Sequence, residues 1–353
     1  MADPSPAAVE VPAMRELPAG VPSVAVEEAA APAMRAVAEP PVIPVEVVPP
    51  QAAACLARGS AAGDTSVAVH RWVDAAGITH YADRPPTGAA RDHRVIAVSG
   101  LPPIKVEASG HDVNLPDGLQ QQAVADALGV QRVLRDELGV AVPAGLALRI
   151  IFVADPATYG QLIGEPALAG SAGAYSTARQ TIYIRMQPSD EANFVILRHE
   201  LTHAIVHEAV GNLPLPLNEG LAEYFGRYRV VGMGGQVDFR PDRAALVAAA
   251  PAGDGSDALV DLLARDGPAF YAGDPASTRE QRYRRAHALV ALLMQRGEGR
   301  AVLADLLAAQ RADPCVPIVL EELLEARYGG GLRRLAADWA AFMRKPPEGV
   351  SAH

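Results

Sequence analysis

One apolar helical segment constrains this chain more than any other feature. Residues 194–209 read F-V-I-L-R-H-E-L-T-H-A-I-V-H-E-A, so aliphatic side chains surround several histidines and glutamates. Charged and imidazole groups are costly to bury among apolar side chains unless they have partners. The segment therefore predicts a core helix, beginning at Asp190 and running to about Val210, whose polar groups share a common partner.

The polar residues of this helix form an H-E-x-x-H motif at 199–203. His199 and His203 are four residues apart, so both imidazoles lie on one helical face and can reach a single ion. Zinc binds such nitrogen and oxygen ligands, and a catalytic zinc site uses three protein ligands plus a water. Glu200 is adjacent to the first histidine, where it can act on that water. We therefore expect Zn²⁺ as the cofactor.

A third protein ligand is expected from the next helix, which begins near Asn218. The segment L-P-L-N-E-G-L-A-E-Y-F, ending at residue 225, contains Glu219 and Glu223 on one helical face. One of these acids can ligate the metal while the other accepts a hydrogen bond from a ligating imidazole. Gly220, beside the first acid, would permit a close approach of two helices.

These two motifs together resemble a known group of enzymes. H-E-L-T-H followed by N-E-G-L-A-E-Y resembles the gluzincin metallopeptidases, the group of thermolysin and the zinc aminopeptidases. The resemblance is closer to the bacterial peptidase MA-like domains and covers about residues 115–345. It implies an α+β fold with a zincin-like metallopeptidase domain, which would hydrolyse bonds in a peptide or protein substrate.

The resemblance also implies a role for each motif residue. His199, His203 and Glu219 would be the zinc ligands, and Glu200 would be the general base. Glu223 would lie behind the ligands as the partner of His199. Because 15 residues separate His203 from Glu219, fewer than is usual in the large peptidases, Glu223 is the reserve ligand.

Two further features are expected only from the resemblance. A tyrosine or histidine from a later helix would stabilise the oxyanion, and Tyr283 and His287 are the candidates. The strand Thr181–Arg185, which precedes the motif helix, would pair with extended substrate. Thr181 and Tyr183 are therefore the candidate substrate-binding residues.

A second hypothesis of a different class is a non-catalytic zinc-fold protein that serves as a binding scaffold in the bacterial cell envelope. Other enzymes with this motif fit less well. The third metzincin histidine would fall at Ala209, and neither Cys55 nor Cys315 lies in a deformylase-like motif. His207 is rotated by about 80° from His199 around the helix, so it is not an expected ligand.

The N-terminal region has a different composition. Residues 1–65 contain no aromatic side chain, and 11 of the chain's 30 prolines fall in the first 50 residues. Such a Pro/Ala-rich segment has little to bury, so we expect a disordered arm. No signal peptide is expected, because Met1 is followed by neither a basic region nor a continuous apolar run.

A small β module is expected over residues 66–110. Two β-prone runs, Val67–Val73 and Ile78–Tyr81, flank a turn that contains Gly77, which is a hairpin signal. The pattern R-W-x-D-x-x-G-x-x-x-Y-x-D-x-P-P at 71–86 resembles a small domain of unknown function near the N-termini of bacterial envelope proteins. The resemblance implies the periplasm or cell envelope, with an envelope partner for this module. The missing signal peptide leaves the cytoplasm open.

Charge and composition exclude some partners. The net charge of −10 argues against nucleic acid as a partner, because a phosphate backbone requires a basic face. No apolar run approaches the roughly 20 residues that span a bilayer, so no transmembrane segment is expected. Whether the two cysteines pair stays open at this point.

Apolar spacing predicts further elements. We expect a helix over 119–138, strands over 146–153, 172–176 and 181–186, and helices over 242–250, 258–265, 278–295, 300–310, 318–328 and 332–344.

Overall fold

The structure is a computed structural model that describes most residues from 66 onward. These residues all belong to one compact unit of the chain, Val47–His353. The described residues are 66–73, 79–82, 85–86, 88, 91–99, 104–115, 117–143, 145–164, 170–231, 234–265, 268–271 and 276–353. The arm predicted over 1–65 lies outside them. The described part combines helices and strands, which confirms the predicted mixture of α and β structure.

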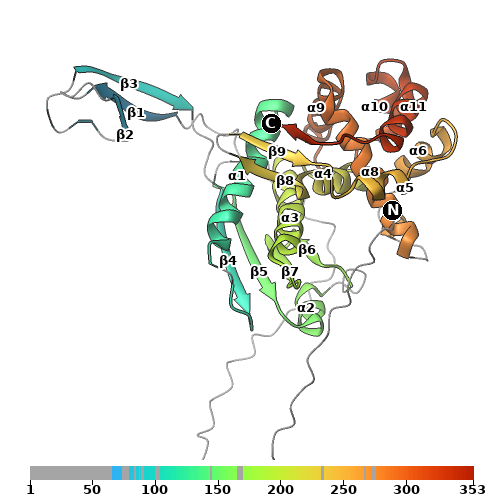
Figure 1. The fold of residues 1–353 in the computed structure, drawn as a ribbon, viewed down its shortest axis with the longest axis horizontal. Helices are drawn as coiled ribbons and strands as arrows, with labels where there is room; N and C mark the ends of the chain where they lie inside the picture. The colour runs from blue at the N-terminus through green and yellow to red at the C-terminus, as the bar shows by residue number, and fades with distance from the viewer. Residues whose placement is uncertain are drawn as a thin grey trace, which may run out of the picture. The chain divides into compact units, whose positions relative to one another are not determined.

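The first described unit of structure is a small antiparallel sheet (Figure 1). It consists of β1 (Ser66–Val73), β2 (Thr79–Ala82) and β3 (Arg91–Ser99), with β1 in the middle. β1 and β2 pair antiparallel, with His70 opposite Ala82. The hairpin predicted from the β-prone runs is therefore confirmed.

A second, four-stranded sheet supports the candidate site. Its order is β4 (Lys105–His111), β5 (Ala147–Val153), β7 (Thr181–Arg185) and β6 (Gly173–Ser176). β4, β5 and β7 run parallel, and β6 runs antiparallel at the edge. β4 lies almost wholly within residues 66–110, the range predicted for the β module, but it pairs with β5 along its whole length and belongs to this sheet.

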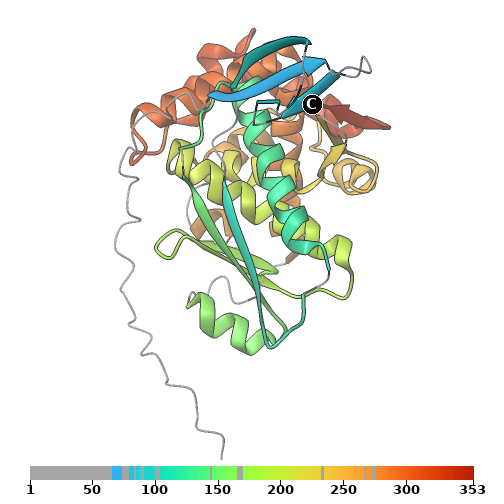
Figure 2. The ribbon, with the colours of Figure 1, turned by 90° about the vertical axis from the view of Figure 1, so that its left-hand side faces the viewer.

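The two faces of this sheet are covered by different helices. Alternate side chains of β5 and β7, such as Ile150 and Ile182, belong to the main core, where α1 (Leu119–Leu138) and α3 (Asp190–Val210) pack. Figures 1 and 2 show both helices along the sheet. The intervening side chains face α2 (Pro156–Ile163), where Tyr183 packs against Tyr159. This alternation follows from the two-residue period of a strand.

Local signals at its ends define α3. Ser189 caps the N-terminus, accepting a hydrogen bond of 3.3 Å from the amide of Ala192, and acidic residues occupy the first turn. Both features stabilise a helix start, where the backbone N–H groups have no internal partners. The helix ends at Gly211, whose φ of 97° favours glycine. α4 (Leu215–Gly226) follows after Pro214, three residues before the predicted start.

α4 is fixed against α8 (Ala276–Gln295) by Gly220. A Cβ atom at this position would lie 2.5 Å from the carbonyl oxygen of Ala286 and 2.7 Å from Cγ2 of Val290. Only glycine fits, as the sequence suggested, so the helix that carries Glu219 and Glu223 meets α8 almost backbone to backbone.

The remaining elements complete the core. A small sheet has the order β10-β9-β8, and short helices surround α8. Their bounds are β8 (Tyr228–Val231), β9 (Gly234–Asp238), β10 (Val350–Ala352), α5 (Arg243–Ala248), α6 (Ser256–Leu263), α7 (Pro268–Tyr271), α9 (Gly297–Ala312), α10 (Leu320–Arg327) and α11 (Gly331–Arg344). None of the described helices has the length and apolar character needed to cross a membrane.

Candidate metal centre

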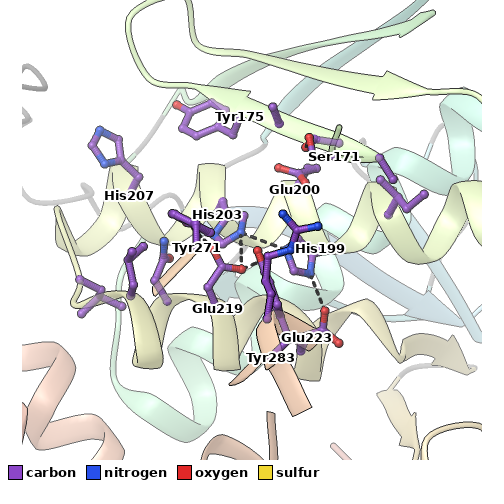
Figure 3. Close-up of a pocket in the computed structure, with 18 of the residues that line it drawn as sticks. Ser171, Tyr175, His199, Glu200, His203, His207, Glu219, Glu223, Tyr271 and Tyr283 are labelled. Carbon is purple, nitrogen blue, oxygen red and sulfur yellow. Dashed lines mark hydrogen bonds and ion pairs between the residues drawn. The ribbon is translucent and has the colours of Figure 1, made fainter. Parts of the chain in front are cut away.

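Three donor groups from α3 and α4 converge on one point (Figure 3). The Nε2 atoms of His199 and His203 are 3.1 Å apart. Oε2 of Glu219 lies 3.4 Å from Nε2 of His199 and 3.5 Å from Nε2 of His203. The structure therefore brings together the three residues predicted as ligands.

These separations fit a small tetrahedral ion. Zinc bonds to histidine nitrogen and carboxylate oxygen of about 2.0–2.1 Å require ligand atoms about 3.3 Å apart in a tetrahedron. The three observed distances lie on both sides of that value. Oε2 of Glu219 is buried and has no hydrogen-bond partner in the described part of the chain. Because an unpartnered buried carboxylate oxygen is costly, a cation at this point would stabilise it.

The charges of the three groups are strongly coupled. Burial alone would lower the pKa of His203, but the adjacent carboxylate of Glu219 outweighs this effect and raises the pKa to about 9. Burial conversely favours the neutral form of Glu219, yet the two histidines hold its pKa well below the usual range. Glu219 is therefore in the anionic form that binds metals.

Glu223 occupies a different position from Glu219. Its Oε1 atom lies 3.6 Å from Nδ1 of His199, on the far side of the ring from the point of convergence. Its Oε2 atom lies 3.4 Å from Nη1 of Arg284. A carboxylate on the second ring nitrogen orients the imidazole and selects its tautomer.

Arg284 belongs to a small charged network behind this contact. Its Nη1 atom also lies 3.2 Å from Oδ1 of Asp242, and Asp242 accepts two hydrogen bonds from Arg227. Asp242 is almost completely buried. The network connects α8 to the residues that follow α4 and holds the carboxylate of Glu223 in place.

Glu200 lies beside the three donor groups and faces β6. A Cβ atom at Gly173 would lie 2.6 Å from Oε1 of Glu200, so the strand passes directly over this carboxylate. Burial raises the pKa of Glu200, and the neighbouring histidines and a backbone hydrogen bond from Tyr175 oppose that shift. The carboxylate of Glu200 is therefore held beside the two histidines in a largely desolvated position.

A cavity of about 660 Å³ opens over these groups. Residues of β6, α3, α4 and α8 line it, together with Tyr271 of α7. His207 also lines the cavity, with its ring 6.1 Å from that of Tyr175, but it is not one of the three converging ligands. This size is sufficient for a few residues of an extended chain.

Two tyrosines project toward the donor groups (Figure 3). The hydroxyl of Tyr271 donates a 2.7 Å hydrogen bond to Oε1 of Glu219. Tyr283, a predicted oxyanion donor, lines the same cavity, and burial followed by the charge of Glu219 raises the pKa of its phenol. Both groups therefore keep their protons at neutral pH. Sequence reasoning missed Tyr271, whose helix has only four residues and shows no apolar period.

The prediction that His287 stabilises an oxyanion is wrong. Its ring is fully buried, stacks on Phe239 and is not part of the cavity lining. Burial lowers its pKa to about 4. Although it lies one turn after Tyr283, a four-residue step rotates by about 40°, which moves its side chain into the core beneath the site.

The predicted substrate contacts of Thr181 and Tyr183 are also wrong. Their strand, β7, is paired on one edge with β5 and on the other with β6, so it cannot accept another strand. Both side chains are buried and neither lines the cavity. Tyr183 instead packs on the α2 face of the sheet. The edge next to the cavity belongs to β6, whose residues Gly173 and Tyr175 line it.

Comparison with known families finds one match in the N-terminal part. Residues 52–110 match a family described as a domain of unknown function, DUF4124. The match contains the predicted β module and starts before it. A search of curated proteins finds no match to this chain.

Proposed function

We propose that this chain is a zinc-dependent metallopeptidase with a zincin-like domain of the gluzincin type. The observation that carries the proposal is the convergence of His199, His203 and Glu219 at tetrahedral spacing. Glu200 stands beside them at the floor of a peptide-sized cavity. A third-ligand carboxylate and an adjacent free carboxylate are the two acids that metal-assisted hydrolysis requires.

Each group would have a distinct task in amide hydrolysis. A bound zinc ion would supply Lewis-acid activation of a water and of the scissile carbonyl. Glu200 would accept a proton from the water as its oxygen bonds to the carbonyl carbon. It would then deliver that proton to the amine nitrogen as the C–N bond breaks. Tyr283 would donate a hydrogen bond to the developing oxyanion, while Tyr271 would keep its single hydroxyl hydrogen on Glu219.

The substrate would lie along β6. No other described strand pairs with the outer edge of β6, and Gly173 and Tyr175 of this strand line the cavity. An extended peptide can add to such an edge through main-chain hydrogen bonds. This arrangement would place a peptide carbonyl over Glu200, because Gly173 is in contact with that side chain.

The second candidate function is a zinc-binding scaffold without catalysis, and Glu200→Gln separates the two. Under the peptidase proposal, the purified protein contains one zinc and cleaves members of a peptide library, and a chelator stops cleavage. Glu200→Gln should keep its zinc while cleavage falls by about 10²- to 10⁴-fold. Zinc binding without any cleavage would favour the scaffold, and cleavage unaffected by the chelator would refute both.

We propose the bacterial periplasm or cell envelope as the compartment. The pattern at 71–86 supports this, since it resembles a domain of envelope proteins. Cys315 is disulfide-bonded, and disulfides persist mainly in oxidising compartments. The β module would provide a contact with another envelope component.

A further inference from the structure

The first half of α8 contains four arginines within seven residues, and three of them are engaged by other groups. Arg282 donates to the carbonyl of Phe270 at 2.9 Å, Arg285 donates to the carbonyl of Ala249 at 3.1 Å, and Arg284 contacts Glu223 and Asp242. These three arginines therefore have structural roles.

Arg279 is the exception. Its side chain is exposed and lines the cavity, and within the described part of the chain it makes no hydrogen bond or ion pair. It lies four residues before Tyr283, so the two side chains are neighbours on one face of α8. The backbones of Arg279 and Tyr283 are about 6 Å apart along the helix axis, so a group bound by Arg279 would lie near the tyrosine.

The other charges of the cavity make this position distinctive. Glu200, Glu223 and Glu280 also line it, so most of the wall disfavours an anionic group on a substrate. Arg284 is already occupied by Glu223 and Asp242. At the far end of α3, the wall is formed by Leu213 and Leu215 together with His207. A substrate anion therefore has one uncommitted guanidinium to approach.

We propose that Arg279 is a specificity-determining residue that binds a carboxylate of the peptide substrate. The carboxylate is either the C-terminal group of the peptide or the side chain of an Asp or Glu, and both share the planar geometry that a guanidinium binds. This inference rests on the proposed peptidase function and adds the substrate class to it.

The test measures peptide binding, which does not depend on turnover. The zinc-loaded Glu200→Gln protein is titrated with fluorescently labelled peptides in which a single Asp occupies each position in turn. Matched peptides carry Asn in place of Asp, or a C-terminal amide in place of the free carboxylate. One of these neutral replacements should weaken binding about fivefold, as expected for a partly exposed ion pair. The replacement that does so identifies which carboxylate of the peptide Arg279 binds. Adding Arg279→Gln should abolish that difference.

Arg333→Gln on α11 is the matched control, because this arginine is exposed but does not line the cavity. It should leave the fivefold difference intact. Equal binding of charged and neutral peptides would overturn this inference alone, as would a difference that survives Arg279→Gln. Failure of every peptide to bind would refute the proposed peptidase function as well.

Discussion

The hydroxyl of Tyr271 donates a 2.7 Å hydrogen bond to one oxygen of Glu219, while the other oxygen of that carboxylate faces both histidines of the motif. A short helix far along the chain therefore orients the third donor group. The same hydroxyl lies on the cavity. Tyr271 thus joins the geometry of the metal centre to the surface that a substrate would meet.

This relationship predicts different effects for the two tyrosines. Tyr271→Phe removes the hydrogen bond to Glu219, so zinc affinity should fall about tenfold, as for other partners of metal ligands. Tyr283→Phe should leave zinc affinity unchanged and lower kcat by about 10²-fold if its hydroxyl meets the oxyanion. Chelator competition and steady-state kinetics on both variants measure the two effects. Equal zinc affinity in the two variants would contradict the first expectation.

The two glutamates of α4 should also behave differently. Glu219→Ala removes a converging donor atom, so the protein should lose stoichiometric zinc after dialysis. Glu223→Gln keeps a hydrogen-bond acceptor near Nδ1 of His199, and its zinc affinity should fall by about tenfold at most. Metal analysis of both variants decides between them. Zinc loss from the Glu223 variant alone would reverse the assignment of ligand and orienting residue.

The close passage of β6 over Glu200 can be tested with one methyl group. In Gly173→Ala the new Cβ would lie 2.6 Å from Oε1 of Glu200 and would displace the carboxylate. A shift of this kind should reduce kcat by about 10²-fold with zinc still bound. Gly170→Ala is the control, because none of the described atoms lies within 4 Å of its new Cβ. Full activity in Gly173→Ala would show that Glu200 need not occupy this position.

His287 should make the protein sensitive to mild acid. The unfolded chain protonates this residue below a pKa of about 6.5, whereas burial lowers the folded pKa to about 4. The unfolded state therefore binds more protons in this window, and stability should fall by about 3 kcal/mol as the pH drops from 6.5 to 4. In His287→Leu, the free energy of unfolding measured by urea titration should depend less on pH between 6.5 and 4. If the free energy of unfolding of this variant still fell with pH as in the wild type, groups other than His287 would cause the acid sensitivity.

The bonded state of Cys315 predicts a specific thiol count. The chain has two cysteines, and the structure describes Cys315 as disulfide-bonded. Protein isolated from its own compartment without reductant should therefore show no reactive thiol. Peptide mapping without reduction should recover the peptide that contains Cys315 in a disulfide-linked form. Labelling of Cys315 by a thiol reagent before reduction would argue against an oxidising compartment.

Local signals explain why several elements were predictable. The helix expected over 119–138 is found with those limits, because apolar spacing indicates its face and Gly139 adopts a φ of 66° at its end. The motif helix is equally well marked by its apolar residues and its cap at Ser189. The spacing of His199 and His203 on that helix is a local property as well, so their approach followed directly from the sequence.

The errors concern relations between distant segments. β7 lies inside the sheet and β6 lies at its edge. The residues of β7, including Thr181 and Tyr183, do not indicate in the sequence which strand has a free edge for a substrate. The burial of His287 depends on how α8 packs beneath α4. Tyr271 reaches the site from a four-residue helix, and β10 is a three-residue strand that pairs with the distant strand β9. Neither feature has a periodic pattern that could have revealed it.

The contact at Gly220 divides the cavity into a stiff wall and an adaptable one. Because α4 and α8 meet with no space for a side chain, Glu219, Tyr283 and Arg279 must move as a unit. The opposite wall is β6, a four-residue strand held by one neighbour. Bending of β6 would therefore accommodate substrates of different thickness. Laboratory evolution of new selectivity should accumulate substitutions in β6 and leave α4 and α8 unchanged.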